Sequence, residues 1–187
     1  MRYYVLCIHK ATLVEIDSLL PKRFPYQNLA NVEWRIEYMG KPVEELSQDM
    51  VSLIQGSTIM LLSVVHKESE KVYTTALSWV YAVNERKIRF AIDAKSEFVS
   101  ILENDPDLVL TFIGLESVYA IIGKAAIKTR QTEGTTLKLA ILEVDVQEVR
   151  DIIFYGGKIV TEPAFMKTYN AELVKKLDQE VKDIIYG

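Results

Sequence analysis

The sequence has little of the chemistry that most metal centres and many catalytic sites need. It contains one cysteine, Cys7, and two histidines, His9 and His66, among 187 residues. A single cysteine excludes an intramolecular disulfide and a metal site built from several thiolates. Two histidines far apart in the chain give little support to a histidine-based metal centre, a haem site or a serine–histidine hydrolase site. We therefore expect a function that needs none of these groups.

Long apolar runs and an excess of positive charge are also missing, and we expect no leader sequence. No apolar run approaches the roughly 18 residues of a membrane-spanning helix, and the apolar stretch after Met1 is too short for a signal sequence. The formal net charge is -4, which argues against a large nucleic-acid-binding surface. We expect a cytoplasmic protein that binds neither nucleic acid nor membrane.

Hydrophobic residues, by contrast, make up 49% of the chain, enough for a sizeable core. β-Branched, aromatic and alternating patterns predict strands at 59–65, 72–83, 88–93, 108–114, 118–129, 137–146 and 151–155. Helical spacing predicts a helix before Gly56, a short one from about Ser96, and a last one capped by Asn170. Mostly antiparallel strands with one helix inserted midway indicate a mainly β protein, a closed or partly closed β-barrel with a few helices.

The strand predicted at 59–65, "IMLLSVV", is apolar on both alternating faces. Such a strand needs a cover on each side, and the barrel interior supplies only one of them. A helix or a second subunit has to supply the other. A homodimer is the simplest source, because twofold symmetry is the commonest arrangement of identical chains.

The step from the strand at 88–93 into the next helix carries the residues "AKS", which include Lys95 and Ser96. A helix start offers unpaired backbone N–H groups and a partial positive charge, so it can bind an anion such as a phosphate. Serine is also an ordinary N-cap residue, and a lysine here can be a solvated surface charge. The residues alone therefore leave a phosphate site and simple self-capping as alternatives.

The strand predicted at 72–83 offers a second candidate surface. Ser78 shares one of its faces with Thr74, Ala76, Val80 and Ala82, a row of small side chains against which a flat ligand could lie. Trp79 points to the opposite face of an ideal strand, so both side chains cannot touch one ligand there. We therefore expect Trp79 to act across a dimer or at a bend, or to be an ordinary core aromatic.

Three segments in this order, "LSWVYAVNERKIRFAIDAKS", "ILENDPDLVLTFIG" and "SVYAIIGKAAI", resemble the pyridoxamine 5'-phosphate oxidase-like, FMN-binding split-barrel superfamily. The resemblance implies a homodimeric, six-stranded antiparallel split barrel with FMN in clefts at the subunit interface. It implies cofactor contacts from Ser78, Trp79, Lys95 and Ser96. It covers none of residues 1–42, which we expect to be an N-terminal extension to a domain at 43–187.

The sequence departs from the resembled pattern at one position. Relatives that bind FMN often carry a basic residue two places after the serine, where this chain has Phe98, and the cation Lys95 comes before the serine instead. Two hypotheses follow. The chain is an FMN-dependent oxidoreductase of unknown substrate, or it is a non-catalytic or cofactor-free dimer that serves as a flavin-binding or interaction protein. No residue stands out as a catalytic acid or base.

Overall fold

The computed structural model describes residues 41–187, all of which belong to one compact unit. The predicted extension at residues 1–42, with Cys7 and His9, lies outside the described residues except for its last two positions. Near the start of the described residues, the backbone of Val43 bridges to Val149 of the sheet. Among the described residues, no helix combines the length and the apolar character needed to cross a membrane.

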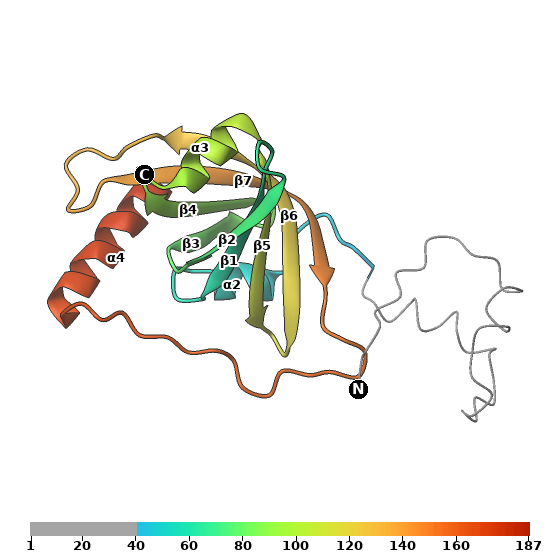
Figure 1. Cartoon of the computed structure of the whole chain (residues 1–187). Coiled ribbons are helices and arrows are strands. Elements are labelled where there is room, and N and C mark those ends of the chain that lie inside the picture. Colours follow the sequence, from blue (N-terminus) through green and yellow to red (C-terminus); the bar gives the residue numbers. More distant parts are fainter. Residues whose placement is uncertain (1–40) are drawn as a thin grey trace, which may run out of the picture. The chain divides into compact units, whose positions relative to one another are not determined.

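The described part of the chain folds into one antiparallel sheet of seven strands and three helices (Figure 1). The strands are β1 (Met60–His66), β2 (Lys71–Leu77), β3 (Val80–Asn84), β4 (Lys87–Asp93), β5 (Asp107–Gly114), β6 (Ser117–Thr129) and β7 (Leu139–Asp151). Their order in the sheet is β2-β1-β5-β6-β7-β4-β3. The mainly β, antiparallel prediction is confirmed, whereas the expected number of six strands is wrong.

The extra strand arises because the single strand predicted at 72–83 is two strands, interrupted at Ser78 and Trp79. A tight turn, in which the Val80 N–H donates to the Ser78 carbonyl at 2.9 Å, makes the interruption. Leu77 and Val80 are both buried, although residues three apart on one strand face opposite sides. The two-residue step lets both side chains enter the core, and it carries the chain from one edge of the sheet to the other.

The short strand predicted at 151–155 is also wrong. β7 runs without a break from Leu139 to Asp151, and the chain then leaves the sheet. The Asp151 carboxylate accepts the Ile153 N–H at 3.1 Å, and the Phe154 carbonyl accepts the Gly157 N–H at 2.9 Å. The Ile152 N–H still donates to the Val118 carbonyl of β6 at 2.8 Å, and the two turning bonds then direct the backbone away, so no separate strand forms.

The helices are α2 (Gln48–Leu53), α3 (Glu97–Asn104) and α4 (Ala171–Tyr186). The main core lies inside the curved sheet, and its largest fully buried side chains include Phe90, Phe112, Ile54, Met60 and Leu62. α4 forms a second, smaller core on the opposite face of the sheet. There Val181 and Ile185 pack with Tyr81, Ala91 and Ile141 from β3, β4 and β7. The predicted cap of α4 is confirmed, because the Asn170 side chain accepts the Leu173 N–H at 2.8 Å.

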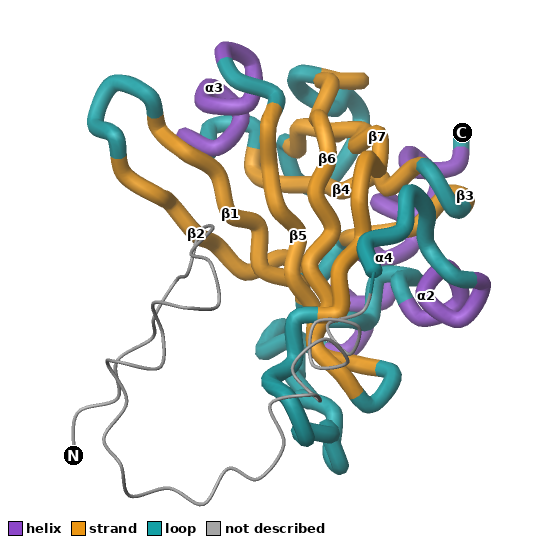
Figure 2. Tube along the Cα trace, turned by 90° about the vertical axis from the view of Figure 1, so that its right-hand side faces the viewer, coloured by secondary structure: helices purple, strands orange, loops and turns teal. Residues whose placement is uncertain are grey.

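The outer face of β2, β1 and β5 has no such cover from the described residues. Leu61, Val65, Val72 and Ile113 are exposed there, with half of Val65 open to solvent. Figure 2 shows these strands side by side. Among the described residues, only those of the barrel interior cover the strand predicted at 59–65, and they cover one of its two faces.

Candidate functional site

The backbone between β4 and α3 is held by an aspartate rather than by the predicted serine. Asp93 ends β4, and its carboxylate accepts the Lys95 N–H at 2.8 Å while its carbonyl accepts the Ser96 N–H at 2.9 Å. Ser96 takes the N-cap position of α3 in an extended conformation, but its hydroxyl makes no capping hydrogen bond. Ser96 does not cap the helix through its side chain, so the hydroxyl is available to a ligand.

Two cationic side chains flank this helix start. Lys95 is exposed, and its ammonium group forms no hydrogen bond or ion pair with any of residues 41–187. Arg130 donates from Nη1 to the Ala94 carbonyl at 2.6 Å, and its Nε lies 2.8 Å from a carboxylate oxygen of Glu103 on α3. Arg130 is thus engaged by Ala94 and by Glu103 in the last turn of α3. The first turn itself carries the acidic Glu97, so Lys95 is the unpaired cation beside Ser96 at this helix start.

Arg130 is a residue near this helix start that sequence reasoning did not single out. A signal was present, because Arg130 is the one basic residue between Lys128 and Lys138. The sequence alone does not show which residues a single cation in a polar loop will contact. The bond to the Ala94 carbonyl joins that loop to the end of β4.

Phe98 is the residue that stands where relatives often carry a cation. Its side chain is only 7% exposed and belongs to the main core, together with Ile101 and Leu102 of the same helix. The short helix predicted from about Ser96 is thereby confirmed, with these three side chains in the core. A basic side chain at position 98 would enter the core without a partner, which is costly. The position two places after the serine is therefore used for packing in this chain.

Ser78 and Trp79 lie at the step between β2 and β3, so Trp79 stands at a bend, one of the alternatives given for it, and its part in cofactor binding stays a prediction. The Trp79 indole N–H donates to an Asp178 carboxylate oxygen on α4 at 2.6 Å. The Lys167 ammonium lies 5.0 Å from the centre of the Trp79 ring, a cation–π contact. The indole is thus engaged by α4 and by the segment that leads to it.

The row of small side chains expected around Ser78 is broken by the same step. Thr74 and Ala76 lie on the exposed outer face of β2, whereas Val80 and Ala82 are buried in the core. The prediction that these residues share one face is therefore wrong. The two strands offer no continuous row of small side chains against which a flat ligand could lie. Among the predicted site residues, the structure brings Lys95 and Ser96 together, and no hydrogen bond joins them to Ser78 or Trp79.

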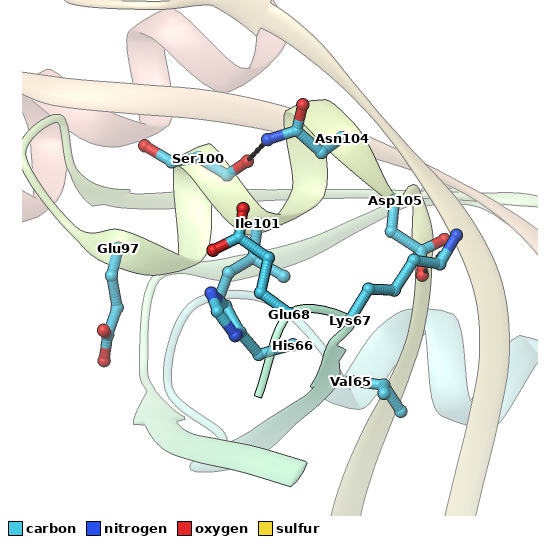
Figure 3. A pocket seen from close by; sticks show the side chains of 9 residues that line it. All are labelled: Val65, His66, Lys67, Glu68, Glu97, Ser100, Ile101, Asn104 and Asp105. Carbon is cyan, nitrogen blue, oxygen red and sulfur yellow. Dashed lines mark hydrogen bonds and ion pairs between the residues drawn. The ribbon is translucent and has the colours of Figure 1, made fainter. Parts of the chain in front are cut away.

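A cavity of about 510 Å³ lies between the β1–β2 turn and the exposed side of α3 (Figure 3). Three carboxylates line it, from Glu68, Glu97 and Asp105, against one lysine, and that lysine, Lys67, is 3.1 Å from the Asp105 carboxylate. His66 is turned toward the loop, where its Nδ1 lies 2.9 Å from the Ser69 hydroxyl. This excess of negative charge makes the cavity unsuitable for a phosphate. Within residues 41–187, no cluster of acidic, histidine or cysteine side chains could hold a metal ion.

Comparison with known proteins gives a likeness in fold only. No family model matches the chain, and no curated protein matches it. Solved structures that it resembles include HupZ of Group A Streptococcus, at 15% identity and a TM-score of 0.47 over 62% of this chain and 99% of that one. General stress protein 26 of Bacillus anthracis str. Sterne is 14% identical, with a TM-score of 0.45 over 57% and 94% of the two chains.

A further similar structure is a Clostridium acetobutylicum protein related to general stress protein 26, of the pyridoxinephosphate oxidase family. It is 12% identical, with a TM-score of 0.47 over 61% of this chain and 92% of that one. These neighbours include the group of proteins that the sequence resembles. At such identities a shared fold assigns no activity, so the function has to be argued from the residues of this chain.

Proposed function

We propose that this chain is an FMN-binding protein and that the start of α3 holds the phosphate of the flavin. The observation that carries the proposal is the unused Ser96 hydroxyl beside the unpaired Lys95 ammonium. A phosphate dianion would accept hydrogen bonds from that hydroxyl and from the first N–H groups of the helix. Lys95 would balance its charge, taking the part that a basic residue at position 98 plays in relatives.

The assembly that we propose is a homodimer with a cofactor cleft at each end of its interface. The exposed apolar side chains on β1, β2 and β5 support it, because a monomer seldom leaves such a face open to water. Ser78 and Trp79 remain proposed cofactor contacts, and Trp79 would reach the flavin only at the edge that Asp178 and Lys167 leave open. A cytoplasmic location stays a prediction.

The reaction class that we propose is oxidation–reduction. FMN supplies hydride or single-electron transfer when it is bound, and the protein contributes binding and orientation. The residues around α3 would hold the phosphate end, far from the reactive ring, so they affect affinity rather than the chemical step. None of the described side chains at this site stands out as an acid or base, and the substrate stays unnamed.

The alternative is a split barrel that works without a cofactor, as an interaction protein. Two observations favour it. Phe98 fills the core where relatives often carry a cation, and the Trp79 indole already has a partner in Asp178. In that case Lys95 is an ordinary surface charge and the apolar outer face is the functional feature.

Visible absorption separates the two proposals. The purified protein is incubated with FMN, desalted, and scanned; we expect retained flavin near one equivalent per chain. Lys95→Glu should weaken FMN binding at least about tenfold, because it replaces a charge-assisted contact by repulsion. Riboflavin lacks the phosphate, so its binding should change less than about twofold. Lys182→Glu, the same charge change at an exposed position of α4, should affect neither ligand.

Two results would contradict the phosphate site. If Lys95→Glu weakens FMN and riboflavin equally, the phosphate is not held at α3. If the wild-type protein stays colourless after incubation with FMN, the flavin proposal fails and the cofactor-free alternative takes its place.

A further inference from the structure

A second cavity, of about 660 Å³, lies at the N-terminal half of α4, away from the turn that carries Lys95. Its walls are the first two turns of α4, the segment from Pro163 to Tyr169 that leads into the helix, and Gly56-Ser57 after α2. Figure 1 shows this segment running to the start of α4, the last helix of the chain. The volume lies in the range of small-molecule sites, which bury most of a ligand of drug size.

The cavity has aromatic walls that remain open to water. Phe165 is 39% exposed and Tyr169 is 60% exposed, and both line the cavity together with Val174 of α4. Two large rings facing one hollow leave apolar surface hydrated in the absence of a ligand. A planar aromatic molecule would cover both rings and gain from stacking as well as from burial.

The charged residues that line the cavity differ in whether they already have a partner. Asp178 lines it, but its carboxylate already accepts the Trp79 indole N–H at 2.6 Å and forms an ion pair with Lys167. Lys175 also lines the cavity, is exposed, and has no hydrogen bond or ion pair within residues 41–187. Lys175 is therefore the charged residue of this cavity that can still pair with a ligand. A ligand that complements it carries a negative charge.

We propose that this cavity is a binding site for a small planar aromatic anion, such as an aromatic carboxylate. Its ring packs against Phe165 and Tyr169, and its carboxylate pairs with Lys175. Asp178 is held by Trp79 and Lys167, which keeps its own charge from opposing the ligand. The proposal does not rest on flavin binding, because the residues that would contact the ligand, Phe165, Tyr169 and Lys175, are not among the proposed cofactor contacts. Asp178 and Lys167 do contact Trp79, which is one of those contacts.

Calorimetry with 2-naphthoate and its neutral counterpart 2-naphthamide tests the proposal on the full chain. We expect one equivalent of 2-naphthoate to bind, and at least about tenfold more tightly than the amide, because only the acid carries the charge. Lys175→Glu should weaken the acid at least tenfold and the amide less than about twofold. Lys182→Glu on the same helix, outside the cavity, should change neither.

A steric variant locates the bound molecule independently of charge. Ala171 is exposed, begins α4 and lines the cavity, so Ala171→Trp should fill the hollow without disturbing the core. We expect it to abolish binding of both naphthyl ligands while circular dichroism and thermal unfolding stay close to wild type. If Ala171→Trp leaves binding intact, the ligand sits elsewhere and the proposal is wrong.

Three other outcomes would overturn the proposal. The first is no heat of binding from the folded wild-type protein at millimolar ligand. The second is equal weakening of the acid by Lys175→Glu and Lys182→Glu, which would mean that only overall charge matters. The third is a change of oligomeric state on Ala171→Trp in light scattering, which would mean that another copy of the chain covers the cavity.

Discussion

The two halves of the outer sheet face differ in how they meet their surroundings. Over β3, β4 and β7, α4 buries an apolar strip, and beyond it Arg89 and Lys87 pair with Glu143 at 2.7 and 3.0 Å. Over β2, β1 and β5, the only charged outward position of the described strands is Asp107 at the start of β5, and Leu61 and Val65 are exposed. One half is completed by its own helix and its own ion pairs. The other has the composition of a surface that another surface covers.

This difference shows why a strand pattern alone does not identify its cover. β1 and β7 both have apolar residues on both faces, yet only β7 receives a helix from its own chain. The helix that covers β7 comes from the end of the sequence, far from the strand it protects. Adjacent sequence therefore gives no hint of which half is closed.

The sharpest way to break the comparison is to place the same charge in each half. Val181 is 1% exposed under α4, so Val181→Asp buries a carboxylate without a partner and should lower the free energy of unfolding by at least about 4 kcal/mol. Val65 is 50% exposed, so Val65→Asp should lower the free energy of unfolding of the isolated chain by less than about 1 kcal/mol. Urea denaturation at low protein concentration measures both.

Val65→Asp has a separate effect if the open half is a subunit interface. We expect it to convert a dimer into a monomer in light scattering, because it would bury a charge against a second apolar face. Lys182→Glu serves as the control that changes surface charge elsewhere. A wild-type protein that is monomeric at all concentrations would show that the open half is not a contact between identical chains.

A glycine next to the closed edge gives the second test. The backbone of Gly56 pairs with β3 and has a φ of +84°, and a Cβ there would lie 2.4 Å from the Tyr81 ring. Gly56→Ala should cost about 3 kcal/mol from strain and overlap together. Gly134 also has a positive φ, of +71°, but a Cβ there meets nothing within 4 Å. Gly134→Ala should therefore cost only about 1 kcal/mol, and equal losses in thermal unfolding would refute the packing argument.

The buried tyrosine under α4 sharpens the comparison through pH. Burial, with smaller contributions from Asp178 and Tyr186, raises the pKa of Tyr81 to about 12. The unfolded chain loses this proton near pH 10, so the folded state holds it longer and stability falls between about pH 10 and pH 12. We expect a loss of about 2 kcal/mol between pH 9 and pH 11.5. Tyr81→Phe should not show this loss in its free energy of unfolding, measured by urea denaturation at each pH. Identical pH profiles for the variant and the wild type would exclude Tyr81 as the source of the loss.

Much of the fold can be predicted from the sequence where a pattern is local. The helix of Phe98, Ile101 and Leu102 follows from spacing, and the Asn170 cap follows from residue type. The strands predicted at 108–114 and 118–129 form and pair, joined by a turn in which Leu115 and Glu116 both have positive φ. Such features depend on a few neighbouring residues, so tertiary contacts do not overrule them.

The step at Ser78-Trp79 could not be predicted, because its cause is not local. Residues 72–83 read as one β-branched and aromatic run, and only the burial of both Leu77 and Val80 requires a break. The same holds for the helix start. Serine before a helix predicts a cap, but Asp93 satisfies a neighbouring N–H and leaves the Ser96 hydroxyl unused. Arg130 reaches that turn through a loop whose position the sequence does not define.

The order of the strands also sets a schedule for folding. As the chain leaves the ribosome, the two hairpins β1–β2 and β3–β4 appear first, and they are joined only by Ser78-Trp79. They form the two margins of the finished sheet, and the strands that belong between them, β5 to β7, are synthesised last. The sheet is therefore completed from its margins inward, by pairings distant in sequence, such as β4 with β7. Such late closure is slow. The inner edge of the first hairpin stays open to pairing with another chain until β5 arrives, and that of the second hairpin until β7 arrives.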